Sequence, residues 1–255
     1  FHPAGHLLGS AQIRLEKGGV VWVVSGDYKR EVDKTCEPFE LVRCHGFVTE
    51  TTFGLPIYRW QKQEEIFHQI NEWWTKNNQE GRTSLLFGYA LGKSQRLLGG
   101  LDSNIGPILV HGSVSRLNPV YEEAGIDLPE TLPASAEHAK KHKGKAIVIA
   151  PPSALGTTWV RKFAPYSTAF ASGWMAVRGR RRNKALDRGF IMSDNIDWPD
   201  LMKSIEESGA EKIWTTHGQS ETVAKHLSEL GYDAKSIETR FTGDGEDDDK
   251  LEEDG

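Results

Sequence analysis

Hydrophobic and polar residues alternate along the first 50 residues in the manner of β-strands. The segment AQIRLEKGGVVWVVSGDY holds two such runs, joined at Lys17-Gly18-Gly19, and this pattern predicts a hairpin. A third run, GFVTETTFG, ends in another polar and glycine-rich turn. The chain is therefore expected to begin with β-structure.

The pattern changes to a helical period in RWQKQEEIFHQINEWWTKNNQEG, where Ile66, Ile70, Trp73 and Trp74 fall on one face. Short apolar runs then alternate with helical segments: TSLLF, GPILVHGSV, KAIVIAPPS, RGFIMSDN and EKIWTTHGQ. Helices are expected from Gly92, from Trp198 to about Ser208, and in SETVAKHLSELG, with Ser220 as its N-cap. This alternation predicts an α/β fold with largely parallel strands, in which a second α/β unit between about residues 54 and 188 interrupts the first.

Composition indicates a globular protein of 255 residues, 38% hydrophobic and 26% charged. No apolar run approaches the roughly 20 residues that a membrane span needs, and no secretion signal is recognisable, so we expect a cytoplasmic protein that does not contact membranes. The two cysteines, Cys36 and Cys44, favour reduced thiols over a disulfide framework.

Charge is unevenly distributed. The C-terminal segment GDGEDDDKLEEDG holds eight of the 36 acidic residues and one of the 31 basic ones, which leaves 28 acidic and 30 basic residues elsewhere. We expect residues 243–255 to form a disordered acidic tail. Positive charge is concentrated in RGRRRNK, which suits a phosphate backbone, although solvated basic loops are common. Its cationic residues are Arg178, Arg180, Arg181, Arg182 and Lys184.

Three corners at which a predicted strand passes into a turn carry side chains that can bind metals. They present His6 in PAGHLLGS, Asp27 in VVSGDYK and His217 in IWTTHGQ. Each residue alone is weak evidence for a metal site, because turns commonly contain these residue types. Together they supply imidazole and carboxylate ligands that suit zinc.

The segment GYALGKS looks like a phosphate-binding loop, but its two glycines are separated by three residues where the P-loop has four. We therefore expect a strand-to-helix turn in which Gly92 eases the bend. Lys93 remains a candidate for contact with a phosphate of a larger ligand.

Five segments follow one another along the chain in the order HPAGHLLGSA, VVSGDYK, TETTFGLPIYRW, SDNIDWPDL and WTTHG. This series resembles the later part of a metallo-β-lactamase-fold nuclease of the β-CASP branch. The resemblance is closest to the bacterial ligase-associated DNA exonucleases. The resemblance implies a partial αββα sandwich with an inserted β-CASP domain. The expected boundaries are 1–53 and 189–242 for the metallo-β-lactamase domain, and 54–188 for the insertion.

The resemblance also implies site residues. His6, Asp27 and His217 match zinc ligands, with Asp27 bridging two ions, and Glu50 matches the acidic residue that orients the general acid. Two zinc ions, or manganese, would activate a water for attack on phosphorus. The implied activity is a DNA exonuclease that processes DNA ends in repair, with DNA ligase or helicase as possible partners.

Two departures from the family pattern affect this interpretation. The ligand cluster H-x-H-x-D-H is not present, so we interpret the chain as an N-terminally truncated fragment that is inactive alone. Asn195 stands where the family has its general-acid histidine, with neighbouring Asp194 as a possible substitute. Two alternatives therefore remain open: an RNA-processing β-CASP nuclease, or a catalytically impaired member that only binds nucleic acid.

Overall fold

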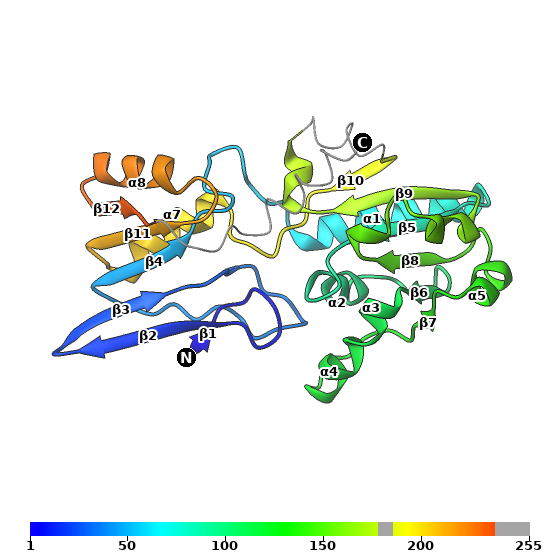
Figure 1. The fold of residues 1–255 in the computed structure, drawn as a ribbon, viewed down its shortest axis with the longest axis horizontal. Coiled ribbons are helices and arrows are strands. Elements are labelled where there is room, and N and C mark those ends of the chain that lie inside the picture. Colours follow the sequence, from blue (N-terminus) through cyan, green and yellow to red (C-terminus); the bar gives the residue numbers. More distant parts are fainter. Residues whose placement is uncertain (178–185, 238–255) are drawn as a thin grey trace. The chain divides into compact units, whose positions relative to one another are not determined.

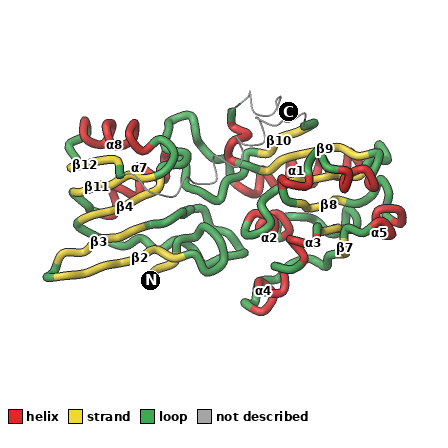
Figure 2. The backbone as a smooth tube through the Cα atoms, viewed as in Figure 1, coloured by secondary structure: helices red, strands yellow, loops and turns green. Residues whose placement is uncertain are grey.

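The computed structural model describes residues 1–177 and 186–237, and it divides into two compact units. Unit 1 comprises Phe1–Val32, Glu37–Arg59 and Asn195–Gly255, and unit 2 comprises Asp33–Cys36 and Trp60–Asp194. The acidic tail and the basic segment RGRRRNK lie outside the described residues. Each unit contains one mostly parallel sheet with helices, coloured yellow and red in Figure 2. The α/β class predicted from the alternation of strands and helices is confirmed.

Unit 1 has a six-stranded sheet in the order β1-β2-β3-β4-β11-β12 (Figure 1). The first two pairings are antiparallel, and β3, β4, β11 and β12 are parallel. The strands are β1 (His2–Pro3), β2 (Ala11–Lys17), β3 (Val20–Val24), β4 (Gly46–Glu50), β11 (Lys212–Thr216) and β12 (Asp233–Ser236). The predicted hairpin is present, and its turn residues Gly18 and Gly19 both have positive φ.

Two helices, α7 (Trp198–Ser208) and α8 (Ser220–Glu229), complete unit 1. Val23, Phe47 and Ile213 lie opposite one another on β3, β4 and β11, so their side chains share one face of the sheet. Residues of both helices, including Leu201 and Val223, join them in one buried cluster. The apolar stripes of the helices therefore cover this face.

The ends of the two helices are formed differently. At α7, the Asp197 side chain accepts a hydrogen bond from the Asp200 N–H (3.0 Å), and Gly209 closes the helix in the left-handed conformation. At α8, the prediction that Ser220 is the N-cap is wrong. The cap position is occupied by Gln219, whose side chain makes no cap hydrogen bond. The Ser220 hydroxyl is instead bonded to Ser236 Oγ (2.9 Å).

Unit 2 is built on a second six-stranded sheet, and every pairing in it is parallel. Its order is β10-β9-β5-β8-β6-β7. The strands are β5 (Thr83–Phe87), β6 (Ile108–Val110), β7 (Leu132–Pro133), β8 (Ile147–Ala150), β9 (Tyr166–Ala171) and β10 (Arg188–Phe190). Such a sheet must be covered on both faces, and two separate buried clusters lie on it.

Helices cover both faces of this sheet. On one face, α1 (Gln63–Gln79) and α2 (Lys93–Leu98) contribute to the first cluster, which includes the buried Trp73 and Trp74. On the other face, α5 (Ala136–Lys141) and η2 (Thr158–Phe163) contribute to the second cluster. The other helices that the structure describes in this unit are α3 (Gly112–Ser115), α4 (Asn118–Glu123), η1 (Pro152–Ala154) and η3 (Gly173–Ala176).

Two local expectations, the turn at Gly92 and the reduced cysteines, are confirmed. Gly92 has a positive φ of 76° directly before α2, as the strand-to-helix turn requires. Both cysteines are free, buried thiols. Among the helices that the structure describes, none is long and apolar enough to cross a membrane.

Candidate functional site

The carboxyl ends of β3, β4 and β11 meet at one edge of the unit 1 sheet, because these neighbouring strands are parallel. Glu50 is the last residue of β4, and His217 directly follows β11. Asp27 lies three residues after the end of β3. Three of the predicted site residues therefore lie at, or shortly after, the ends of strands that meet at the same edge.

Asn195 and Glu50 are 145 positions apart in the sequence and in direct contact in the structure. Asn195 Nδ2 donates to both carboxylate oxygens of Glu50, at 3.1 Å and 3.0 Å. The backbone N–H of Tyr28 donates to Glu50 Oε1 (3.0 Å). Glu50 is 1% exposed, so these donors replace water at the carboxyl group.

The protonation of Glu50 depends on competing effects. Burial, together with the nearby carboxylate of Asp27, raises the pKa of Glu50 to about 8. Hydrogen bonds from Thr52, Asn195 and Tyr28 act in the opposite direction. The structure therefore brings Asp27, Glu50 and Asn195 together, with Asp27 exposed and Glu50 buried beside it.

His217 has a backbone conformation that few residues other than glycine adopt, with φ of 60°. Its carbonyl accepts a hydrogen bond from Thr51 Oγ1 (2.5 Å), and its Nδ1 lies 3.1 Å from Thr216 Oγ1. The following Gly218 approaches Thr51 so closely that an added Cβ would lie 2.6 Å from the Thr51 carbonyl oxygen. The turn after β11 is therefore fixed against the residue that follows Glu50.

His6 lies in the loop between β1 and β2 and is partly buried. Its backbone N–H donates to Ser10 Oγ (3.1 Å). The preceding Gly5 has φ of 71°, and a Cβ there would lie 2.3 Å from the Lys29 carbonyl oxygen. This close approach requires glycine and fixes the loop against the segment that follows Asp27.

The residues present do not by themselves fit a zinc site. Within residues 1–177 and 186–237, no group of three or more His, Cys, Asp or Glu side chains is arranged to hold a metal ion. One zinc ion needs at least three protein ligands within bonding distance, and His6, Asp27 and His217 are not grouped in this way. Their role as metal ligands stays a prediction.

Of the six candidate nucleic-acid contacts, the structure describes one, Lys93. Arg178, Arg180, Arg181, Arg182 and Lys184 lie outside the described residues. The structure places Lys93, the candidate phosphate contact, in the interior of unit 2, where its side chain is 4% exposed. There Nζ donates to the Met192 carbonyl oxygen (2.8 Å) and pairs with Asp194 Oδ2 (2.9 Å).

Asp194, considered as a substitute proton donor, is buried in the same ion pairs. Its Oδ1 accepts from Arg96 Nη1 (3.1 Å), while Oδ2 faces Lys93. Both oxygens of the carboxylate therefore face cations, and neither is placed to donate a proton.

Sequence reasoning missed two groups that shape these surroundings. The Tyr28 N–H is a backbone donor, and no residue pattern marks which backbone group will face a buried carboxyl. Arg96 had no local signal either, because four of the six residues of α2 are polar and polar residues of a helix normally lie in solvent. All six are buried.

Comparison with known proteins adds to this geometry. No family model matches the chain. A protein named "Probable DNA ligase" from Opitutus terrae is 32% identical over 239 residues, which are 93% of this chain and 23% of that protein. A protein named "Endoribonuclease YSH1" from Gibberella zeae is 33% identical over 102 residues, 38% of this chain and 12% of that protein. These similarities support the β-CASP branch of the metallo-β-lactamase fold.

A solved structure has a similar fold. An Enterococcus faecalis protein of unknown function matches with a TM-score of 0.53 over 94% of this chain and 61% of that chain, at 11% sequence identity. Such a likeness concerns the fold alone. The chain spans less than a quarter of the length of the two curated relatives described above.

Proposed function

We propose that this chain is part of a β-CASP nuclease that hydrolyses phosphodiester bonds in DNA. The observation that carries the proposal is the contact of Asn195 with both oxygens of Glu50, beside Asp27, at the edge where β3, β4 and β11 end. The resemblance implied a pairing of residues at these positions in β-CASP nucleases. The match over 93% of the chain to a protein named as a DNA ligase favours DNA, and supports an association with DNA ligase in end processing.

In this proposal, Glu50 holds the Asn195 side chain and Asp27 provides an exposed carboxylate near it. His6 and His217 would join Asp27 as metal ligands only together with the H-x-H-x-D-H ligands that this sequence lacks. The Asn195 amide can donate a hydrogen bond to an oxygen of the substrate, but it cannot transfer a proton to a leaving alkoxide. General-acid catalysis contributes about 10²–10⁴ in rate, so we expect slow turnover.

The first test replaces the amide with a group that transfers protons. In the full-length protein that the gene encodes, Asn195→His should raise cleavage of 5′-labelled DNA by about 10²-fold, because imidazole supplies the missing proton. The matched control is Asn104→His, at an exposed position in unit 2, which should leave the rate unchanged. An equal rate in the Asn195→His variant and the parent protein would contradict the proposed role of this position.

An RNA-processing nuclease is the second candidate, because the relative from Gibberella zeae is named as an endoribonuclease. Parallel digestion of the labelled DNA and its RNA counterpart separates the two candidates. Faster cleavage of RNA would favour the second. Salt-dependent binding of DNA with no cleavage by either the parent protein or the Asn195→His variant would favour a protein that only binds nucleic acid.

The ligand set can be tested independently of activity. Sequencing the coding DNA upstream of the Phe1 codon should show an in-frame H-x-H-x-D-H segment. A stop codon or an unrelated segment there would contradict the predicted two-metal site.

A further inference from the structure

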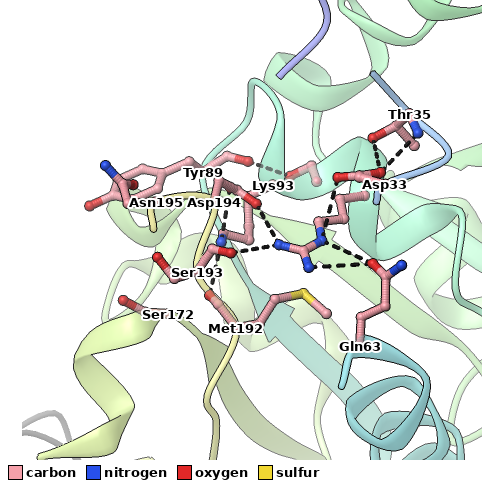
Figure 3. A network of polar contacts seen from close by, with 12 residues as sticks. Asp33, Thr35, Gln63, Tyr89, Lys93, Ser172, Met192, Ser193, Asp194 and Asn195 are labelled. Atoms are coloured by element: carbon pink, nitrogen blue, oxygen red, sulfur yellow. Dashed lines mark hydrogen bonds and ion pairs between the residues drawn. The ribbon is translucent and has the colours of Figure 1, made fainter. Parts of the chain in front are cut away.

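The chain passes four times between the two units: after Val32, Cys36, Arg59 and Asp194. The last of these passages directly precedes Asn195. In unit 2, residues beside three of the passages contact one side chain, Arg96 of α2, in the polar network of Figure 3. Arg96 is 2% exposed.

The guanidinium of Arg96 uses its fixed fork of donors to contact these segments. Nη1 donates to the Ser193 carbonyl oxygen (2.6 Å) and to Asp194 Oδ1 (3.1 Å). Nε lies 3.4 Å from Asp33 Oδ2. Nη2 and Nε donate to Gln63 Oε1, at 3.3 Å and 3.4 Å. One side chain therefore links residues that are far apart in the sequence.

Lys93 completes the arrangement around Asp194. Its ammonium pairs with Asp194 Oδ2 (2.9 Å) and donates to the Met192 carbonyl oxygen (2.8 Å). Figure 3 shows Met192, Ser193 and Asp194 in succession beside Lys93. Lys93 and Arg96 therefore contact the carbonyl oxygens of Met192 and Ser193 and both carboxylate oxygens of Asp194.

The charges in this network balance. Arg96 and Lys93 face Asp33 and Asp194, and all four side chains are at least nine-tenths buried. Asp33 is itself fixed, because its Oδ1 accepts from both the backbone N–H and the hydroxyl of Thr35. Since a buried charge without its partner is costly, this network specifies one arrangement of the segments that it joins.

We propose that Arg96 is a positioning residue for Asn195. Arg96, with Lys93, fixes Ser193 and Asp194 within unit 2. Asn195 is the next residue along the chain, so this anchor limits the backbone positions that Asn195 can take. The catalytic meaning of this positioning rests on the proposed function, whereas the anchoring itself does not.

The first experiment measures anchoring without activity. Arg96→Lys keeps the charge and removes the fork, so it should release Ser193 and Asp194. Hydrogen exchange followed by mass spectrometry should show at least tenfold faster exchange in a peptide spanning 190–198, with β5 and β8 unchanged. Arg116→Lys, on the exposed surface of the same unit, is the matched control and should change neither.

The second readout concerns turnover. In full-length protein that carries Asn195→His, adding Arg96→Lys should lower kcat about tenfold and leave KM for DNA unchanged, because misplacement of a reacting group affects the chemical step. Selective release of 190–198 in a protein that cleaves neither DNA nor RNA would support the anchoring and contradict the proposed function.

A purely structural role predicts a different result. If Arg96→Lys does not fold, Asp194→Asn, which preserves shape and removes one charge, replaces it. Unchanged exchange in 190–198, or faster exchange throughout unit 2 in every variant, would overturn the proposal, because Arg96 would then stabilise the unit without selecting the position of Asn195.

Discussion

Glu50 is a carboxyl group removed from water at the end of β4, and its neighbours oppose one another. Burial and Asp27 favour the neutral form, while the donors from Asn195 and Tyr28 favour the ionised form. Because burial is the largest effect, the pKa is raised and the folded protein holds a proton there that the unfolded chain releases. Protonation of this one residue is therefore coupled to folding.

The sign of this coupling gives a prediction. Below pH 4.5 both states hold the proton; as pH rises towards 8, only the unfolded chain releases it, so the free energy of unfolding should fall. The slope is at most about 1.4 kcal/mol per pH unit. Urea denaturation at pH 5, 6, 7 and 8 should show this slope in the parent protein and a smaller slope in Glu50→Gln.

Glu229→Gln provides the control, because Glu229 is exposed at the end of α8 and should retain the parent slope. A Glu50→Gln variant with the same slope as the parent would mean that another group carries the pH dependence.

Residues differ in how far the sequence predicts their surroundings. The pairing of Glu50 with position 195 could be anticipated only through the family resemblance, since 145 positions separate the two. The ion pairs of Arg96 could not, because a charged residue in a helix normally lies in solvent. What buries Arg96 is the tertiary requirement that short α2 cover a parallel sheet, and no local pattern encodes that requirement.

Among the secondary-structure elements, β4 lies at the centre of the unit 1 sheet, between β3 and β11. Its first residue, Gly46, lies opposite Trp22 of β3, and the Trp22 ring covers the space that a side chain would occupy. This ring contacts Trp214 of β11, with centroids 4.3 Å apart. The absence of a side chain at Gly46 therefore allows an aromatic pair to form across β4.

Gly46→Ala tests this packing. The added Cβ would lie 2.4–2.5 Å from atoms of the Trp22 ring, so the ring must move. We expect unit 1 to lose about 1–3 kcal/mol of stability, as in other overpacked sites, with an altered near-ultraviolet circular dichroism signal from the tryptophan pair.

Gly112→Ala is the matched control, because a Cβ at that position has no heavy atom within 4 Å. Equal stability losses in the two variants would show that the glycine backbone, and not the space beneath Trp22, determines the effect.

The strands and helices themselves were largely predictable, because amphipathic periods and glycine turns mark them locally. The hairpin at Gly18-Gly19 and the start of α2 after Gly92 are examples. The cap of α8 was mispredicted, since Ser220 has a hydrogen-bond partner in β12 that only the folded sheet provides. Local patterns thus predict elements better than they predict which partner a polar side chain will select.

For the whole molecule, each unit has its own buried cores. Leu86 belongs to unit 2 and Ile205 to unit 1, and both are 0% exposed. Truncation of either to alanine should cost about 2–5 kcal/mol. We expect Leu86→Ala to accelerate hydrogen exchange in β8 and β9, and Ile205→Ala to accelerate it in β4 and β11.

Each variant serves as the other's control. Faster exchange across both units in either variant would mean that the units unfold as one cooperative body, contrary to what their separate cores lead us to expect.

Unit 1 is completed by a strand that follows the whole of unit 2 in the sequence, since β4 pairs with β11. During synthesis on the ribosome, every residue of β5–β10 emerges before that partner exists. Until β11 has been synthesised, one edge of β4 therefore lacks its hydrogen-bond partner, and such an edge readily pairs with other chains. Nascent chains that stall before Lys212 should consequently depend on chaperones more than the finished protein does.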